Sequence, residues 1–85
     1  MKQICYTVKD PEGVHALPAS GLIKLAESFA CDISAEGNGK RVDAKHVFGL
    51  VSLGVKQGQT LTLTFDGEDE DKAAGEIERY LQGNL

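Results

Sequence analysis

The sequence predicts an α+β fold, with a four-stranded antiparallel sheet whose helices all cover one face and leave the other open. Two kinds of observation carry this prediction. Apolar residues alternate with polar ones in several short segments, as in half-buried strands, and recur every three or four residues in others, as in amphipathic helices. In addition, the Asn38-Gly39 dipeptide between two alternating segments is typical of a tight hairpin, which joins antiparallel strands.

The first half of the chain is expected to form a strand, a helix and a hairpin. The strand has its apolar positions at Ile4, Tyr6 and Val8, and turn residues 10–13 break it. From about Pro18 the spacing becomes helical, with apolar positions at Ala19, Leu22, Ile23, Ala26 and Phe29. The strands of the hairpin place their apolar residues on one face, at Ile33 and Ala35 and then at Val42 and Ala44.

The second half adds a short helix, a strand and a longer helix. Apolar residues are too dense between Lys45 and Gly54 for a half-exposed strand, which favours one or two helical turns. Leucine and phenylalanine alternate with threonine over residues 60–65, the clearest strand in the chain. Acidic residues 68–71 then precede an apolar stripe that Gly83 can end. The predicted order is β-α-β-β-α-β-α, with three helices, in a single domain over residues 1–85.

Composition limits the classes of function. A chain of 85 residues holds one modest core, and a net charge of −4 with a pI near 5.0 argues against nucleic acid as a partner. The densest basic group, Lys40, Arg41 and Lys45, is explained most simply as a solvated hairpin and loop. Without a signal-peptide segment or an apolar run of about 20 residues, we expect a cytoplasmic protein that does not insert into a membrane.

The two cysteines are predicted to be structural. Cys5 and Cys31 form neither a CxxC pair nor a zinc-ligand spacing, and Cys5 is expected to be a core thiol because its segment is apolar. No metal and no cofactor are expected.

His15 is the most informative residue. Pro18 suits a first helical turn, which places His15 directly before the helix, close to the free backbone N–H groups of Ala16 and Leu17. The helix dipole disfavours a charged imidazole, so we expect a neutral, nucleophilic ring, and the same N–H groups can hold phosphoryl oxygens. An ordinary surface histidine that caps a helix is the alternative on these grounds alone.

Three segments together resemble the HPr family, the histidine-containing phosphocarriers of the bacterial sugar phosphotransferase system. They are Gly13-Val14-His15-Ala16-x-Pro18-Ala19, Val47-Phe48-Gly49-Leu50-x-Ser52-Leu53-Gly54 followed by Gln57-Gly58, and Gly67-Glu68-Asp69-Glu70. The resemblance covers essentially the whole chain and implies an open-faced β-sandwich. It also implies that His15 accepts a phosphoryl group from enzyme I, which takes it from phosphoenolpyruvate, and donates it to sugar-specific enzyme II components. Such a carrier is not itself an enzyme, and we expect a monomer.

The resemblance further implies a partner-docking surface around the histidine. Its residues are Leu17, Ser20, Gly21 and Lys24 on the first helix and Val47, Phe48 and Val51 on the short helix. For Phe48, a place in the core is an equally good interpretation from the sequence.

Two positions depart from the family pattern. Position 17 is Leu where the family usually has an Arg that pairs with the phosphoryl oxygens, and only Lys24 or Lys45 suggest themselves as substitutes. Position 46 is His where many relatives carry a serine that HPr kinase phosphorylates, so no regulatory hydroxyl is present there. His46 is either a second phosphoacceptor or, more simply, a helix-start histidine. The alternative function is therefore an HPr-like regulatory or interaction module with weak or no phosphotransfer.

Overall fold

A computed structural model describes the backbone of residues 1–85 and the side chains of all of them except Val47. The elements follow one another as β1 (Lys2–Thr7), α1 (Ala16–Glu27), β2 (Asp32–Gly37), β3 (Lys40–Asp43), α2 (Val47–Ser52), β4 (Thr60–Asp66) and α3 (Glu70–Asn84). The predicted β-α-β-β-α-β-α order is confirmed.

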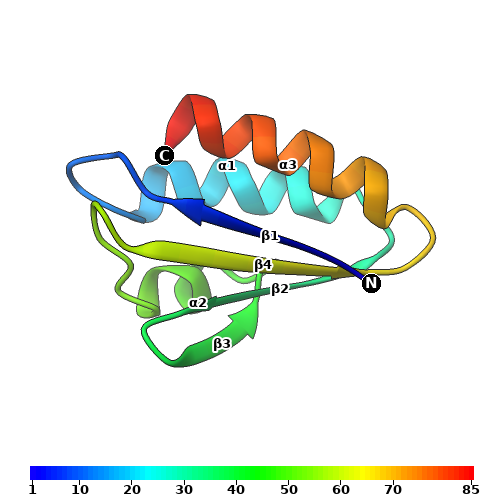
Figure 1. Cartoon of the computed structure of the whole chain (residues 1–85), viewed down its shortest axis with the longest axis horizontal. Helices are drawn as coiled ribbons and strands as arrows, with labels where there is room; N and C mark the ends of the chain where they lie inside the picture. Colours follow the sequence, from blue (N-terminus) through cyan, green and yellow to red (C-terminus); the bar gives the residue numbers. More distant parts are fainter.

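The four strands form one antiparallel sheet in the order β1-β4-β2-β3 (Figure 1). The long strand β4 lies in the middle and pairs with both β1 and β2, so that Leu61 lies opposite Tyr6 and Phe65 opposite Ile33. These cross-strand pairs are apolar because alternate residues of each strand point to the same face. The predicted sheet, open on one face, is thereby confirmed.

The core lies between this apolar face and the helices. Its largest fully buried side chains are Phe65, Leu22, Leu50, Leu61, Leu63, Ile77, Leu81, Val8 and Val55. Each of the three helices contributes at least one of them, since its apolar stripe faces the sheet. The helices α1 and α3 also contact each other, as α1 and α2 do.

The predicted hairpin joins β2 and β3. Asn38 and Gly39 both have positive φ angles, 51° and 78°, as a type I′ turn requires. Nδ2 of Asn38 also donates to the carbonyl oxygens of Leu53, at 2.9 Å, and Gly54, at 3.0 Å. The turn residue therefore fastens the hairpin to the end of α2.

Two predictions about single residues are wrong. Cys5 is exposed rather than in the core, because it shares the outward face of β1 with Thr7 while Tyr6 points inward. Its Sγ lies 3.7 Å from the Thr62 hydroxyl across the open face. Gly83 does not end the last helix, which continues to Asn84. Cys31, in contrast, is buried.

Candidate functional site

His15 lies directly before α1, as the sequence predicts. Its backbone is extended, with φ −121° and ψ 176°, and its carbonyl oxygen accepts the first helical hydrogen bond from Ala19, at 3.1 Å. The amides of Ala16 and Leu17 belong to the first turn, where a helix supplies no backbone acceptor. His15 is the N-cap residue of α1, although its imidazole makes no capping hydrogen bond. Its role as a phosphoacceptor, rather than as an ordinary helix-cap histidine, stays a prediction.

The loop that carries His15 is fastened to the rest of the protein on both sides. The Val14 amide donates to the Val55 carbonyl oxygen, at 2.9 Å, just after α2. Gly13, with φ 71°, permits this approach, because a Cβ there would lie 2.5 Å from the same oxygen. The Asp10 amide donates to the Leu85 carbonyl oxygen, at 2.8 Å. The histidine is therefore presented on an anchored loop between α2 and the end of α3.

Two carboxylates lie beside the imidazole, and the sequence analysis missed both. Oδ2 of Asp10 and Oε2 of Glu12 are each 3.7 Å from Nε2 of His15. This distance is too long for a hydrogen bond but short enough for a strong electrostatic interaction with a charged group on the ring. The other Asp10 oxygen accepts a hydrogen bond from the Glu12 backbone amide, at 2.8 Å, and this bond holds the carboxylate in place. The negative charge of the two carboxylates opposes the effect of the positive helix N-terminus on the imidazole. The neutral ring therefore stays a prediction.

A shallow hollow of about 230 Å³ opens beside the histidine. Its walls are Asp10, His15, Leu17, Pro18, Tyr80 and Asn84, a lining without Lys or Arg. The Tyr80 hydroxyl donates to the Pro18 carbonyl oxygen, at 2.6 Å, and burial raises the pKa of this phenol. The tyrosine thus joins α3 to the first turn of α1 and closes one side of the hollow.

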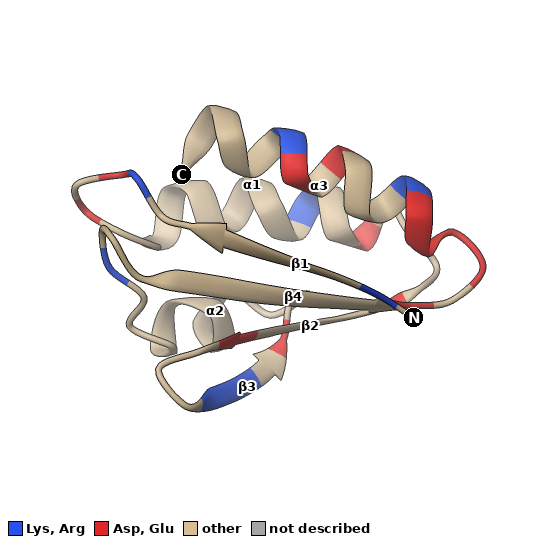
Figure 2. Ribbon diagram, viewed as in Figure 1, with Lys and Arg blue, Asp and Glu red and all other residues tan. Residues whose placement is uncertain are grey.

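Neither lysine suggested as a substitute for the missing arginine lies at the site. Nζ of Lys45 donates to the carbonyl oxygens of Phe29 and Cys31, each at 3.1 Å, beyond the far end of α1. Lys24 is nine residues along the helix from His15, a rise of roughly 13 Å. Figure 2 shows the same distribution, with the charges of α1 confined to the part remote from the histidine loop.

Large apolar side chains are exposed on the first turn of α1 and on α2. Leu17 is 80% exposed, Phe48 87% and Val51 37%. The interpretation of Phe48 as a core residue is therefore wrong, and its neighbour Leu50 fills the core instead. The Val47 side chain lies outside the described residues. Since α1 contacts α2, the apolar side chains belong to neighbouring elements.

The remaining residues of the expected docking surface lie along α1. Ser20 and Lys24 are exposed, and the Ser20 hydroxyl donates to the Ala16 carbonyl oxygen, at 2.8 Å. Gly21 is less exposed because it lies under α3, where an added Cβ would overlap the Tyr80 hydroxyl. Gly21 therefore has a packing role that no pattern in the sequence indicates.

His46 is the exposed N-cap residue directly before α2. Its Nε2 lies 3.9 Å from Oδ2 of Asp43, and its side chain makes no capping hydrogen bond. This position agrees with a helix-start histidine.

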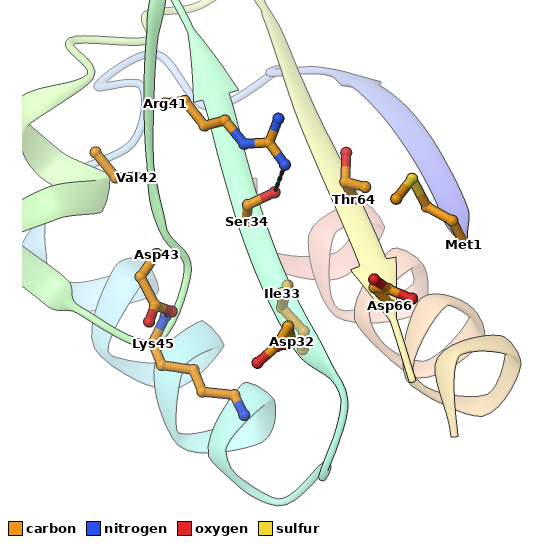
Figure 3. A pocket seen from close by; sticks show the side chains of 10 residues that line it. All are labelled: Met1, Asp32, Ile33, Ser34, Arg41, Val42, Asp43, Lys45, Thr64 and Asp66. Carbon is orange, nitrogen blue, oxygen red and sulfur yellow. Dashed lines mark hydrogen bonds between the residues drawn. The ribbon is translucent and has the colours of Figure 1, made fainter. Parts of the chain in front are cut away.

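A second hollow, of about 500 Å³, is a separate feature on the sheet side (Figure 3). Its side chains include Asp32, Ser34, Arg41, Thr64 and Asp66, and the Arg41 guanidinium donates to Ser34, at 3.0 Å. Acidic and basic groups are mixed there, without a concentration of either charge. This hollow shares no lining residue with the one beside His15.

Among the described residues, no group of three or more His, Cys, Asp or Glu side chains is arranged to hold a metal ion. In the same part of the chain, no helix combines the length and the apolar character needed to cross a membrane.

An open four-stranded sheet covered by helices, with a histidine directly before the first of them, is the architecture of small histidine phosphocarriers. The family model described as "PTS HPr component phosphorylation site" matches residues 2–83, nearly the whole chain. The chain belongs to the HPr family, and the resemblance found in the sequence is confirmed.

Solved structures agree with this assignment. HPr-C-His from Thermoanaerobacter tengcongensis is 33% identical, with a TM-score of 0.92, covering 99% of this chain and 94% of that one. HPr from Bacillus anthracis str. Ames is 33% identical, with a TM-score of 0.87 and coverages of 95% and 96%. Crh, the Bacillus subtilis catabolite repression containing protein, is 36% identical, with a TM-score of 0.77 and coverages of 100% and 98%.

Proposed function

We propose that the chain is a phosphocarrier that accepts a phosphoryl group on His15 from enzyme I and donates it to sugar-specific enzyme II components. The observation that carries the proposal is the placement of His15 directly before α1, beside the first-turn amides of Ala16 and Leu17. Backbone N–H groups at a helix N-terminus bind phosphate oxygens, so the oxygens of a phosphoryl group on the ring have hydrogen-bond donors within the same turn.

The chemistry requires only one nucleophilic ring nitrogen. Its lone pair attacks the phosphorus atom of the phosphoryl group carried by enzyme I, and an N–P bond forms. The bond between phosphorus and the donor group of enzyme I breaks at the same time, and its electron pair stays on that donor group. Transfer to enzyme II reverses the roles: a nucleophile of the acceptor attacks phosphorus, and the electron pair of the N–P bond returns to His15. The chain acts as a substrate and intermediate, not as a catalyst.

Both partners need to reach the same histidine. The proposed docking surface consists of Leu17, Ser20, Gly21, Lys24, Val47, Phe48 and Val51. Exposure of Leu17 and Phe48 supports it, because large apolar side chains on so small a protein are otherwise a liability. Gly21 contributes by letting α3 approach, and Lys24 can contribute only at the edge, given its distance from His15.

A second candidate is a regulatory or interaction module that binds partners with weak or no transfer. The exposed Leu17 favours it, since a leucine side chain cannot pair with phosphoryl oxygens as arginine does. The similarity to Crh, whose name refers to catabolite repression, points the same way.

A pulse-chase experiment separates the two candidates. The wild-type chain is incubated with enzyme I and labelled phosphoenolpyruvate, and enzyme II components are then added. A carrier takes up label and releases it to enzyme II, whereas the module binds enzyme I without either step. Phosphorylation of a Leu17→Arg variant but not of the wild type would favour the module.

We further propose that residues 1–85 act as one cytoplasmic domain and as a monomer. An HPr dimer from T. tengcongensis and a swapped Crh dimer are among the similar structures, so the oligomeric state needs its own measurement. Sedimentation equilibrium over a range of protein concentrations gives it: a mass that stays at 9.1 kDa supports the monomer.

A further inference from the structure

The charges around His15 differ from those that a phosphate site needs. Its Nε2 is 3.7 Å from carboxylate oxygens of both Asp10 and Glu12, and the hollow beside it has no Lys or Arg in its lining. We propose that the partner supplies the missing cation, as an Arg or Lys within an apolar docking face that meets Leu17 and Phe48. The inference deepens the proposed function and rests on it.

Phosphorylation makes the imbalance larger. A phosphoryl group adds nearly two negative charges, close to two carboxylates that already carry one each. Asp10 cannot turn away easily, because its second oxygen is held by the Glu12 amide, at 2.8 Å. The N–H groups of Ala16 and Leu17 offer dipoles but no full charge. A cation from outside therefore has both the phosphoryl group and the carboxylates to bind.

No lysine or arginine lines the hollow beside His15. Lys45 is bound to carbonyl oxygens beyond the other end of α1, and Lys24 is roughly 13 Å along the helix. Lys9 and Lys56 are exposed on loops near the histidine loop, yet neither contributes to the hollow. Their contribution is measurable by substitution.

The apolar surroundings define the rest of the partner's face. Leu17 and Phe48 are 80% and 87% exposed, and residues 47–52 of α2 contain no charged side chain. When a partner covers this surface, water leaves and an ion pair at its edge becomes stronger. An arginine suits the role, because its planar guanidinium binds carboxylate and phosphate oxygens in pairs and packs against apolar side chains.

The test is the association rate of the full chain with enzyme I of the same organism, measured over a range of salt concentrations. The key variant combines Asp10→Asn with Glu12→Gln, and Glu12→Gln alone serves if the pair impairs folding. The matched control, Glu36→Gln with Glu78→Gln, makes the same charge change at exposed positions outside the hollow. We expect the wild-type rate to fall with salt, the key variant to be about tenfold slower at low salt, and the control to match the wild type.

A Leu17→Arg variant adds an opposite prediction. If the cation comes from the partner, an arginine on this chain repels it, so association slows as well. If this chain merely lacks its arginine, the same variant associates as fast or faster, and that result would overturn the inference. The inference would also be overturned if the Asp10/Glu12 variant associated faster than the wild type, or if the wild type did not associate with enzyme I at any salt concentration.

Phosphate uptake, read by intact mass in the same samples, keeps the two proposals apart. Uptake by a Lys9→Gln, Lys56→Gln double variant at the wild-type level agrees with a cation from the partner, and loss of uptake would place the cation in this chain. If the wild type binds enzyme I in a salt-dependent way but takes up no phosphate, the carrier function is refuted. The proposal that the partner supplies the cation would still hold.

Discussion

Oδ2 of Asp10 lies 3.7 Å from Nε2 of His15, while the other oxygen of that carboxylate accepts a hydrogen bond from the Glu12 amide. An acidic group thus stands where a phosphoryl carrier would be expected to hold a positive one. With leucine at position 17, the free protein has no cation in the lining of the hollow beside its proposed acceptor. The proposed transfer then depends on the helix N-terminus and on the cation that we propose the partner supplies.

Phe48 tests whether the exposed apolar surface serves binding rather than stability. Because its side chain is 87% exposed, Phe48→Ala should change the free energy of unfolding by no more than about 0.5 kcal/mol, yet weaken binding to enzyme I. Leu50→Ala, at a fully buried position of the same helix, should cost about 2–5 kcal/mol. Urea denaturation and calorimetric titration measure the two effects, and unchanged binding by Phe48→Ala would remove it from the docking surface.

Gly21 and Tyr80 should be energetically coupled. Gly21→Ala places a methyl group against the Tyr80 hydroxyl and should destabilise the protein by about 1–3 kcal/mol. Tyr80→Phe removes that hydroxyl and its bond to Pro18, at a cost of about 1 kcal/mol. In the double variant the methyl group meets less resistance, so the combined cost should be smaller than the sum. Strict additivity in a denaturant double-mutant cycle would contradict the packing described.

Asp69 should make stability depend on acid pH. Hydrogen bonds from the backbone N–H groups of Ala30, at 2.8 Å, and Cys31, at 2.9 Å, lower the pKa of its carboxyl. A carboxyl whose pKa is lower in the folded protein stabilises the fold above its unfolded pKa of about 3.9, and this contribution is lost as pH falls through the folded value.

Asp69→Asn should therefore lower stability at neutral pH and flatten its decline below about pH 4. Asp71→Asn, at an exposed position in the first turn of α3, the helix that Asp69 precedes, is the matched control, and it removes only an exposed ion pair with Lys2, at 3.4 Å. Unfolding midpoints, measured in a series of buffers from about pH 2 to about pH 7, report both effects. An acid limb as steep in Asp69→Asn as in the wild type would contradict this role.

The two cysteines should differ sharply in reactivity. Cys5 is exposed on β1, whereas Cys31 is buried and its pKa is raised to about 11 by burial first and by Asp69 second. Since the thiolate is the reactive form, iodoacetamide near neutral pH should modify one residue quickly, and Cys5→Ser should abolish that fast phase. Rapid modification of Cys31 in the native protein would show that its side chain is accessible.

Local patterns sufficed to predict the architecture. Alternation fixed the faces of the strands, and the Asn38-Gly39 dipeptide fixed the hairpin, because each depends only on neighbouring residues. The error at Cys5 came from giving weight to its apolar character over its position in the alternation, which it shares with Thr7.

The surroundings of His15 were harder to predict because they depend on contacts between distant segments. The turn that brings Asp10 to the imidazole was visible as a turn, but the direction of its carboxylate was not. The sequence suggests Lys45 as a substitute for the missing arginine, although the fold places it beyond the opposite end of α1. The contact of Gly21 with Tyr80 needs the packing of α1 against α3, which no local pattern reports.

The most direct test of the central claim is the intact mass of the wild-type chain and of His15→Ala after incubation with enzyme I and phosphoenolpyruvate. We expect one acid-labile phosphoryl group on the wild type and none on the variant, with both proteins folded. A wild type without phosphate, or a His15→Ala variant that still carries it, would contradict the assignment of His15 as the acceptor.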